Sequence, residues 1–261
     1  MTDLPFEVPG RFWRGNLHTH SDRSDGALSP AETARVYRES GNDFLAITDH
    51  FRPEYEFPIT DTRGLRSDGF TTLIGAELHA PRTEVGQAWH IVAAGLPLDF
   101  QAPGELETGP ELARRARAAG AFVGMAHPAA SLLTAVDAES LDAAHSVEVY
   151  NALADRENRG DSWHLTDVLL NRGHRLTTYA ADDAHLQPQG PAPVSGVGPG
   201  PRGNARTGGA PCRPEGRRSR SIRLPPPTRY MSSPRIRPRP WRPRSTTSGS
   251  CPRSWTRCGG I

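Results

Sequence analysis

Short apolar runs recur along the first 185 residues and alternate with segments of helical periodicity. Seven runs are predicted to be strands, at 12–17, 43–48, 71–76, 89–94, 121–126, 146–150 and 175–180. Most are apolar on both faces, which is typical of strands buried in a parallel sheet. Their spacing is too wide for hairpins, so the pattern predicts parallel strands joined by helical crossovers.

Helix start and stop signals stand between these strands. The string SPAE at 29–32 combines a capping box with proline at the first helical position, and this helix is expected to end before Gly41. The same scheme recurs at 110–119 and at 161–172, each followed by glycine. Seven strands with helical crossovers predict an α/β fold of the (β/α) barrel type. In such barrels the chemistry lies at the C-terminal ends of the strands.

This pattern stops after residue 186. Residues 187–261 hold 15 arginines, a single acidic residue, 15 of the 25 prolines and all three cysteines, with neither helical nor strand periodicity. A segment of this composition buries too little apolar surface to offset its ordering entropy, so we expect disorder. We therefore predict two parts: a barrel at 1–186 and a disordered Arg/Pro/Gly/Ser-rich tail at 187–261. Out-of-frame reading of GC-rich DNA gives these residue types, and we interpret the tail as a frameshifted or otherwise non-native continuation.

The arginines of the tail suggest one function other than catalysis. Fifteen arginines would attract nucleic-acid backbones with a strong dependence on salt. The tail has few aromatic residues, no lysine and no recognisable binding module. We therefore expect no nucleic-acid partner beyond non-specific contact through the tail.

Composition also excludes several classes for the barrel part. It contains no cysteine, so it has neither a disulfide framework nor a thiolate metal site. Residues 1–10 lack a basic segment followed by an apolar run, and no stretch approaches about 18 consecutive apolar residues. A cytoplasmic protein without a membrane partner is the expectation, and any metal ligands must be nitrogen and oxygen atoms.

Histidines and acidic residues gather at the predicted strand ends. Their clusters are His18-Thr19-His20, Asp25-Gly26, Thr48-Asp49-His50, Gly75-Ala76-Glu77, His127-Pro128 and Asp182-Asp183-Ala184-His185. Imidazoles with carboxylates suit Zn, Mn or Fe, and two histidines two residues apart on a strand end can chelate one ion. A lone glutamate among histidines usually bridges two ions. Two or three close metals activate a water and clamp both the attacking and the leaving oxygen, which fits phosphate ester hydrolysis best.

Seven strings carry a family resemblance between residues 13 and 185. In order they are GNLHTHSDRSDGALSP, FLAITDH, IGAELH, WHIVAAG, GMAHP, VEVYN and ADDAH. They resemble the successive motifs of the PHP (polymerase and histidinol phosphatase) metallohydrolases, and the first string is closest to the stand-alone branch related to carbaryl hydrolase. The resemblance implies a distorted (β/α)7 barrel with up to three divalent metals at its C-terminal mouth.

The resemblance also implies nine metal ligands. Carried over position by position, they are His18, His20, Glu77 and Asp183 for the first metal, Asp25, His50 and His185 for the second, and Glu77, His90 and His127 for the third. The last family motif usually reads small-Ser-Asp-x-His, whereas this chain has two aspartates there. The two-residue spacing to His185 favours Asp183 over Asp182.

Several histidines and aspartates in or near these motifs can have a role other than that of a metal ligand. His79 stands near His90 and can substitute for it, and Asp25 can instead cap a turn before Gly26. Asp49 is expected to support the fold or a ligand histidine rather than to bind metal. The remaining histidines are expected at the surface, namely His145, His164 and His174.

The expected function is that of a metal-dependent hydrolase, most simply a phosphoesterase in which a metal-bridged hydroxide attacks a small phosphorylated substrate. Arg23 and Arg52 flank ligand motifs, where each can meet a phosphate oxygen or form an exposed salt bridge. Asp183 and His185 are the pair expected to assist the leaving oxygen. Hydrolysis of a carboxylic or carbamic ester or amide at the same site is the alternative. Two or three metals, their identity, the substrate and the oligomeric state stay open.

Overall fold

The computed structural model of the chain describes residues 12–186. The expectations about the tail at 187–261, which concern disorder, a non-native frame and contact with nucleic acid, lie outside the described residues. The barrel predicted at 1–186 is described from residue 12 onward.

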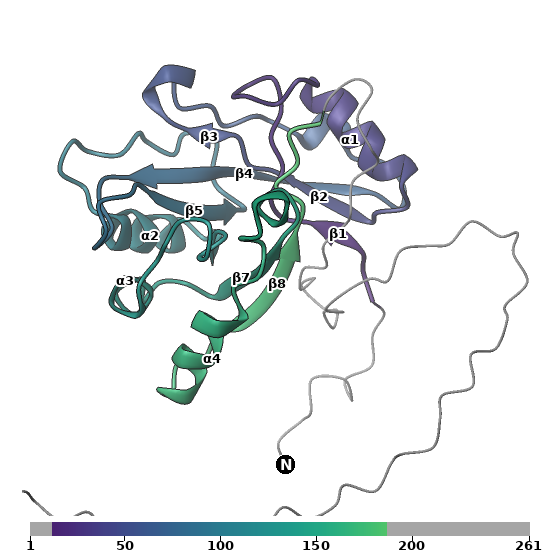
Figure 1. Ribbon diagram of the computed structural model, residues 1–261. Coiled ribbons are helices and arrows are strands. Elements are labelled where there is room, and N and C mark those ends of the chain that lie inside the picture. Colours follow the sequence, from purple (N-terminus) through teal and green to yellow (C-terminus); the bar gives the residue numbers. More distant parts are fainter. Residues whose placement is uncertain (1–11, 187–261) are drawn as a thin grey trace, which may run out of the picture. The chain divides into compact units, whose positions relative to one another are not determined.

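A single curved sheet organises the described residues. Its strands, in spatial order, are β1 (Gly15–Asn16), β2 (Phe44–Ile47), β4 (Thr71–Ala80), β5 (Trp89–Ala94), β6 (Phe122–Met125), β7 (Ser146–Asn151) and β8 (Thr177–Ala181), and the short β3 (His50–Phe51) pairs with β4 beside this path. An isolated bridge between Thr19 and Ala184 joins the segments that follow the first and last strands. The sheet therefore comes close to closing into a barrel, and the predicted seven-stranded α/β barrel is confirmed (Figure 1).

The prediction that all strands are parallel is wrong at β5. Within residues 12–186, β5 runs antiparallel to both of its neighbours, β4 and β6, whereas the other pairs are parallel. The reason is the length of β4, which stays buried past the predicted end at residue 76 and continues to Ala80. Only residues 81–88 then separate β4 from β5, so the two strands form a hairpin. This reversal is the distortion of the barrel.

Three helices follow the predicted start and stop signals. Helix α1 (Pro30–Glu39) has the predicted capping box between Ser29 and Glu32, and α2 (Gly109–Ala118) has an equivalent box at its own start. Helix α4 (Trp163–Asn171) begins two residues later than expected. A glycine with positive φ follows each of these three helices, as the stop signals predicted.

One short helix and three 3₁₀ turns were not predicted. Helix α3 (Ala135–Ser140) is only six residues long, so it shows little periodicity, although Thr134 and Asp137 give it a capping box. The 3₁₀ turns are η1 (Pro53–Tyr55), η2 (Arg63–Leu65) and η3 (Ala154–Glu157).

Apolar side chains pack the helices onto the outside of the sheet. Leu112 of α2 is fully buried in the same cluster as Ile91 of β5 and Val123 of β6, and burial of each such side chain is worth about 1.5–3 kcal/mol. In α1, Tyr37 packs with Leu45 of β2. The helices thus cover the sides of the barrel, and the ends of the strands stay available for polar groups (Figure 1).

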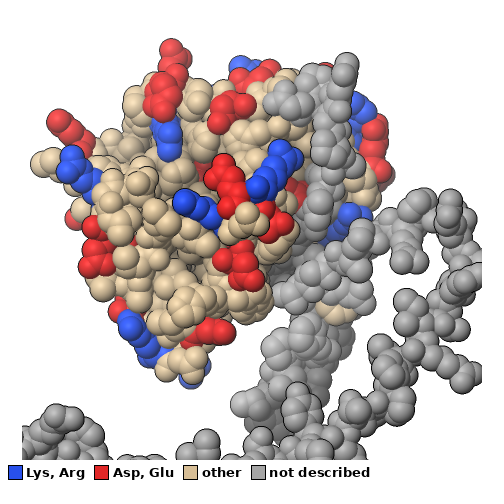
Figure 2. All heavy atoms as spheres, viewed as in Figure 1, with Lys and Arg blue, Asp and Glu red and all other residues tan. Residues whose placement is uncertain are grey.

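The surface of the described part mixes both charge signs. Figure 2 shows arginine and acidic side chains interspersed over the visible face. Among residues 12–186, no helix has the length and apolar character that crossing a membrane requires.

Candidate metal centre

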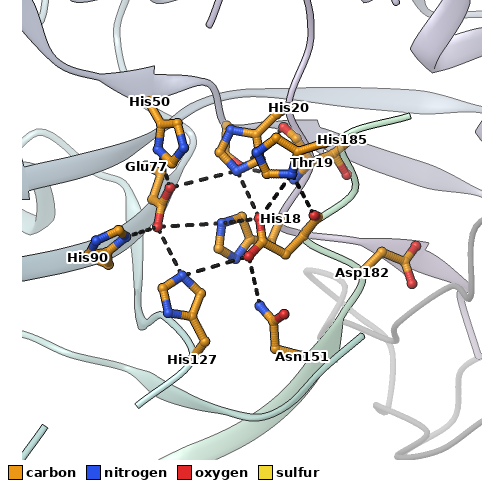
Figure 3. A network of polar contacts seen from close by, with 12 residues as sticks. His18, Thr19, His20, His50, Glu77, His90, His127, Asn151, Asp182 and His185 are labelled. Carbon is orange, nitrogen blue, oxygen red and sulfur yellow. Dashed lines mark hydrogen bonds and ion pairs between the residues drawn. The ribbon is translucent and has the colours of Figure 1, made fainter. Parts of the chain in front are cut away.

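Imidazoles and carboxylates from most of the strands meet at one end of the barrel (Figure 3). His18 and His20 come just after β1, His127 follows β6, and Asp183 and His185 follow β8, whereas Glu77 lies on β4. His90 is the second residue of β5 rather than a residue after it. Because β5 is reversed, its beginning lies at the same end of the barrel as the carboxyl ends of the parallel strands.

Glu77 lies at the middle of this group and is fully buried. Its Oε1 is 2.7 Å from Nδ1 of His90 and 3.1 Å from Nε2 of His127, and its Oε2 is 2.6 Å from Nδ1 of His50. Burial alone would raise the pKa of Glu77, but the neighbouring imidazoles, His90 first, bring it well below its usual range. The carboxylate is therefore ionised and faces histidines on both of its oxygens.

A second set of donors surrounds Asp183. Its Oδ1 lies 3.0 Å from Nε2 of His20 and 3.4 Å from Nε2 of His18, and both imidazoles are fully buried. Burial opposes ionisation of the carboxyl, but the charge of His18 and the close contact with His20 hold the pKa of Asp183 well below its ordinary value. Asp183 is thus a buried carboxylate that shares its oxygen with two imidazoles.

The third set forms around Asp25 at the outer side of the centre. Asp25 Oδ1 lies 3.0 Å from Nε2 of His185, and Oδ2 lies 3.4 Å from Nε2 of His50. The loop that carries Asp25 folds back so closely that a Cβ on Gly26 would lie 2.7 Å from the backbone oxygen of His20. Gly26 therefore has a packing reason, and Asp25 makes ion pairs with histidines rather than serving only as a turn cap.

The geometry of these side chains fits divalent metal ions. Nε2 of His18, Nε2 of His20 and Oε2 of Glu77 are buried without a hydrogen-bond partner, although carboxylate or imidazole atoms lie within 4 Å of each. A buried polar atom left in this state costs roughly 1–3 kcal/mol. Atoms that are close but not directed at one another are expected when they converge on a common ion, and nitrogen with oxygen donors suits Zn, Mn or Fe.

Outer contacts fix the orientation of three of the imidazoles. Nδ1 of His18 donates to Glu148, Nδ1 of His127 lies 2.9 Å from the Ser131 hydroxyl, and Nδ1 of His185 donates to the backbone oxygen of Asp183. In each ring Nε2 then points toward the carboxylates of the centre. Metal-binding histidines in general carry such a partner on the nitrogen that does not bind the metal.

The geometry brings all nine of the expected ligands into one connected cluster. The donors form five groups of three or four residues, and within each group the ligand atoms lie within 4.8 Å of one another. Each expected ligand falls in at least one group. The groups are His20, Asp25, His50 and His185; His18, His127 and Glu148; His18, His20 and Asp183; His50, Glu77 and His79; and Glu77, His90 and His127. Divalent metal binding is the chemistry that this donor set favours.

His79 and His90 both belong to the cluster, and both lie beside Glu77. Nδ1 of His90 is 2.7 Å from Oε1 of Glu77, whereas Nε2 of His79 is 3.5 Å from Oε2 of Glu77 and 2.9 Å from Nδ1 of His50. Burial lowers the pKa of His79 to about 3, so its ring is neutral. The sequence contained the signal for His79, because residues two apart on a strand share a face and His79 stands two residues after Glu77.

The aspartates beside the expected ligands have other contacts. Asp182 turns away from the histidines and accepts a hydrogen bond of 2.8 Å from the hydroxyl of Tyr37. Burial raises the pKa of Asp182 to about 7. Asp49 accepts hydrogen bonds from the backbone nitrogen and the hydroxyl of Ser21, and so holds the chain just after His20 in place.

The two arginines expected to meet substrate lie in different surroundings. Nη2 of Arg52 is 3.2 Å from Nδ1 of His79 and 3.5 Å from Nε2 of His90, so this guanidinium borders the centre. Arg23 has a side chain that is 64% exposed and pairs loosely with Asp22. The structure brings Arg52, and not Arg23, into contact with the cluster.

Of the three histidines expected at the surface, two are exposed, His164 and His174. His145 is half-buried instead, because its Nδ1 accepts a hydrogen bond from the backbone nitrogen of Val123 and its ring stacks on Phe122.

Comparison with known proteins finds similarity at the level of solved structures. No protein-family model and no curated protein matches the chain. A two-domain protein from Bacteroides vulgatus that contains a predicted PHP-like metal-dependent phosphoesterase matches with 20% identity and a TM-score of 0.48, over 68% of this chain and 55% of that one. A protein from Bifidobacterium adolescentis, provisionally assigned as a metal-dependent phosphoesterase, matches with 16% identity and a TM-score of 0.47, over 70% and 91%.

A third structure is an amidohydrolase from Chromobacterium violaceum with sulfate bound and no metal. It matches with 15% identity and a TM-score of 0.50, over 73% of this chain and 93% of that one. The chain spans about half the length of the Bacteroides protein. At these identities the likeness concerns the fold alone.

Proposed function

We propose that this chain is a metal-dependent hydrolase that cleaves phosphoesters. The observation that carries the proposal is the fully buried Glu77 carboxylate, which has imidazoles on both oxygens and an oxygen that no hydrogen bond satisfies. A structural salt bridge would not need this many histidines around one acid. The order of the PHP-like motifs in the sequence adds the reaction class.

The residues that would hold the metals are the nine expected ligands, with Glu77 shared between two positions. When bound, the metals would lower the pKa of a water and neutralise charge on the phosphoryl oxygens. The protein contributes the orientation of the ligands, because the imidazoles of His18, His127 and His185 each have their outer nitrogen fixed by a hydrogen-bond partner.

Arg52 is proposed to bind the substrate phosphate. Its guanidinium borders the centre and its side chain is 31% exposed, so it reaches both the histidines and solvent. A planar guanidinium can donate two parallel hydrogen bonds to phosphoryl oxygens. Arg23 is proposed to have a smaller part, because it extends into solvent.

Asp183 and His185 are proposed to move the proton to the leaving oxygen. The backbone oxygen of Asp183 lies 2.9 Å from Nδ1 of His185, so the two residues orient each other. The imidazole of His185 is partly exposed, whereas the carboxylate of Asp183 is buried. This arrangement supports His185 as the member of the pair that lies nearer to solvent.

A hydrolase assay with matched substrates tests the proposal. The full chain, incubated with Mn²⁺ or Zn²⁺, should hydrolyse p-nitrophenyl phosphate, and excess chelator should abolish this activity. p-Nitrophenyl acetate serves as the parallel substrate, because hydrolysis of a carboxylic or carbamic ester or amide is the second candidate. The observation that favours that candidate is the structural neighbour described as an amidohydrolase. Acetate cleavage without phosphate cleavage would reject the phosphoesterase proposal.

A further inference from the structure

Glu148, which is outside the nine-ligand set, contacts two of its members. It lies on β7 and is fully buried. Its Oε1 accepts a hydrogen bond of 3.1 Å from Nδ1 of His18, and its Oε2 accepts one of 2.5 Å from the backbone nitrogen of His127. One carboxylate thus holds the ring of one expected ligand and the backbone of another.

Asn151, at the end of the same strand, extends this contact to a third expected ligand. Its Nδ2 donates to Oε2 of Glu148 and to Oδ2 of Asp183, both at 3.1 Å. Its Oδ1 accepts a hydrogen bond from the backbone nitrogen of Ala154. The amide of Asn151 is therefore fixed from both sides and joins Glu148 to Asp183.

An irregularity in β7 explains how both side chains reach the centre. In a regular strand, residues three apart point to opposite faces of the sheet. The register of β7 against β8 shifts between Glu148 and Tyr150, as in a β-bulge. Glu148 and Asn151 are both fully buried, whereas Tyr150 is 38% exposed. Bulges next to active sites commonly redirect a side chain in this way.

Two of the ligands that the pair contacts have unusual backbone conformations. The backbone angle φ is 27° at His127 and 50° at Asp183, and residues other than glycine rarely adopt such positive values. Such conformations persist only where surrounding contacts hold them. The hydrogen bond from the His127 backbone to Glu148, and that from Asn151 to the Asp183 side chain, are contacts of this kind.

We propose that Glu148 and Asn151 are positioning residues of the metal centre. Glu148 accepts the Nδ1 proton of His18, which leaves Nε2 as the nitrogen available to a metal, and it fixes the backbone of His127. Asn151 orients the carboxylate of Asp183. The inference rests on the metal centre of the proposed function and adds outer residues that determine its affinity.

The test compares Zn²⁺ affinity among full-chain variants by competition with a chelating dye. Glu148→Gln keeps the shape but has one acceptor oxygen in place of two, so either His18 or the two donors on Oε2 meet an amide NH₂ group. We expect Zn²⁺ binding to weaken about 10–100-fold. Asn151→Ala removes the link to Asp183, with an expected loss of about 10-fold.

Asp137→Asn is the matched control. Asp137 is a buried carboxylate on α3 that accepts hydrogen bonds from the backbone of Glu84 and from Thr134, none of which belongs to the metal centre. This variant should lower the melting temperature and leave Zn²⁺ affinity unchanged. Circular dichroism of each metal-free variant checks the fold, and Asn151→Ala carries the test if Glu148→Gln fails to fold.

A second readout follows the ring of His18 directly. In zinc-loaded wild-type protein labelled with ¹⁵N, Nδ1 of His18 should carry a proton, and in Glu148→Gln this signal should shift or disappear. If wild-type protein binds Zn²⁺ and the folded variants bind it equally well with an unchanged His18 signal, the positioning role is overturned and the proposed function stands. If wild-type protein binds neither Zn²⁺ nor Mn²⁺, both are overturned.

Discussion

Oε1 of Glu77 lies 2.7 Å from Nδ1 of His90, and the two residues come from antiparallel neighbours, β4 and β5. Strands β1, β6 and β8 reach the centre with the residues that follow them, and β4 reaches it with Glu77 in its second half, whereas β5 reaches it with its beginning. The reversal of β5 therefore does more than distort the barrel. It brings an imidazole to the central carboxylate from a strand that would otherwise present the opposite end.

Replacement of Glu77 by glutamine should abolish most of the activity. The amide cannot serve two metal positions as a carboxylate does, and its NH₂ group would face either the His50 or the His90 side. We expect kcat/KM for p-nitrophenyl phosphate to fall by roughly 100-fold or more, since loss of an outer partner alone costs 10–100-fold. Glu139→Gln is the control and should match wild type, because Glu139 is a partly exposed glutamate that pairs with Arg172 outside the centre. Equal activity of both variants would argue against the central role of Glu77.

Removal of metal should destabilise the fold. Some buried carboxylate and imidazole atoms of the centre have no hydrogen-bond partner, and a bound ion would interact with all of them at once. Metal at about 100 times its Kd stabilises the native state by about 2.7 kcal/mol, which corresponds to roughly 5–10 °C in melting temperature for a domain of this size. Calorimetry with chelator and then with added Zn²⁺ or Mn²⁺ measures this. A melting temperature indifferent to both additions would count against the site.

Arg52→Ala should weaken binding of the phosphate without loss of metal. A hydrogen bond to a charged group contributes about 1.5–3 kcal/mol, so kcat/KM for p-nitrophenyl phosphate should drop roughly 10–100-fold. Arg63→Ala is the control, because Arg63 lies in the same loop between β3 and β4 but pairs with Asp61 at the surface. Arg52→Lys should restore part of the loss, since lysine keeps the charge but not the planar fork. Wild-type kinetics in Arg52→Ala would remove this residue from the mechanism.

The pattern of apolar residues predicted which strands exist but not their directions. All seven predicted strands are present because periodicity reports burial, and burial is the same for parallel and antiparallel neighbours. The apolar pattern does not predict the extension of β4 to Ala80, because Glu77 and His79 interrupt the apolar run although both are buried. Tertiary contacts with other polar side chains bury them, and these contacts are not visible in the sequence around β4.

The sequence predicts the expected metal ligands better than it predicts the residues that hold those ligands in place. Spacing to His185 favoured Asp183, and the structure indeed places Asp182 against Tyr37 instead. Glu148 and Asn151 both lie in the VEVYN string that carries part of the family resemblance, but the string does not show which ligands they contact, and the bulge beside Asn151 leaves no mark in the hydrophobic pattern. Outer contacts of this kind arise from the packing of distant strands, so the sequence alone does not pair them.

The ion pair between Glu107 and Arg115 should make a pH-dependent contribution to stability. Nε and Nη2 of Arg115 lie 2.8 and 2.9 Å from the two carboxylate oxygens, and these hydrogen bonds lower the pKa of Glu107 despite its partial burial. A lowered folded pKa means that the contribution is present above the unfolded pKa of about 4.3 and is lost as pH falls through the folded value.

Glu107→Gln should therefore lower the free energy of unfolding at neutral pH, by about 1 kcal/mol or less because both side chains are partly exposed. The difference from wild type should narrow as pH drops below about 4.3. Urea unfolding across a pH series measures it. A difference that stays constant, or grows, toward acid pH would show that the pair does not act through the charge of Glu107.

The number of metal ions bound per chain tests the account most directly. The full chain, purified, loaded by dialysis against Zn²⁺ or Mn²⁺ and freed of loosely bound ions, should retain two or three ions per chain by plasma mass spectrometry. The Glu77→Gln variant treated in parallel should retain fewer. Wild-type protein that is folded yet retains no stoichiometric metal would contradict the central claim that these histidines and carboxylates form a metal centre.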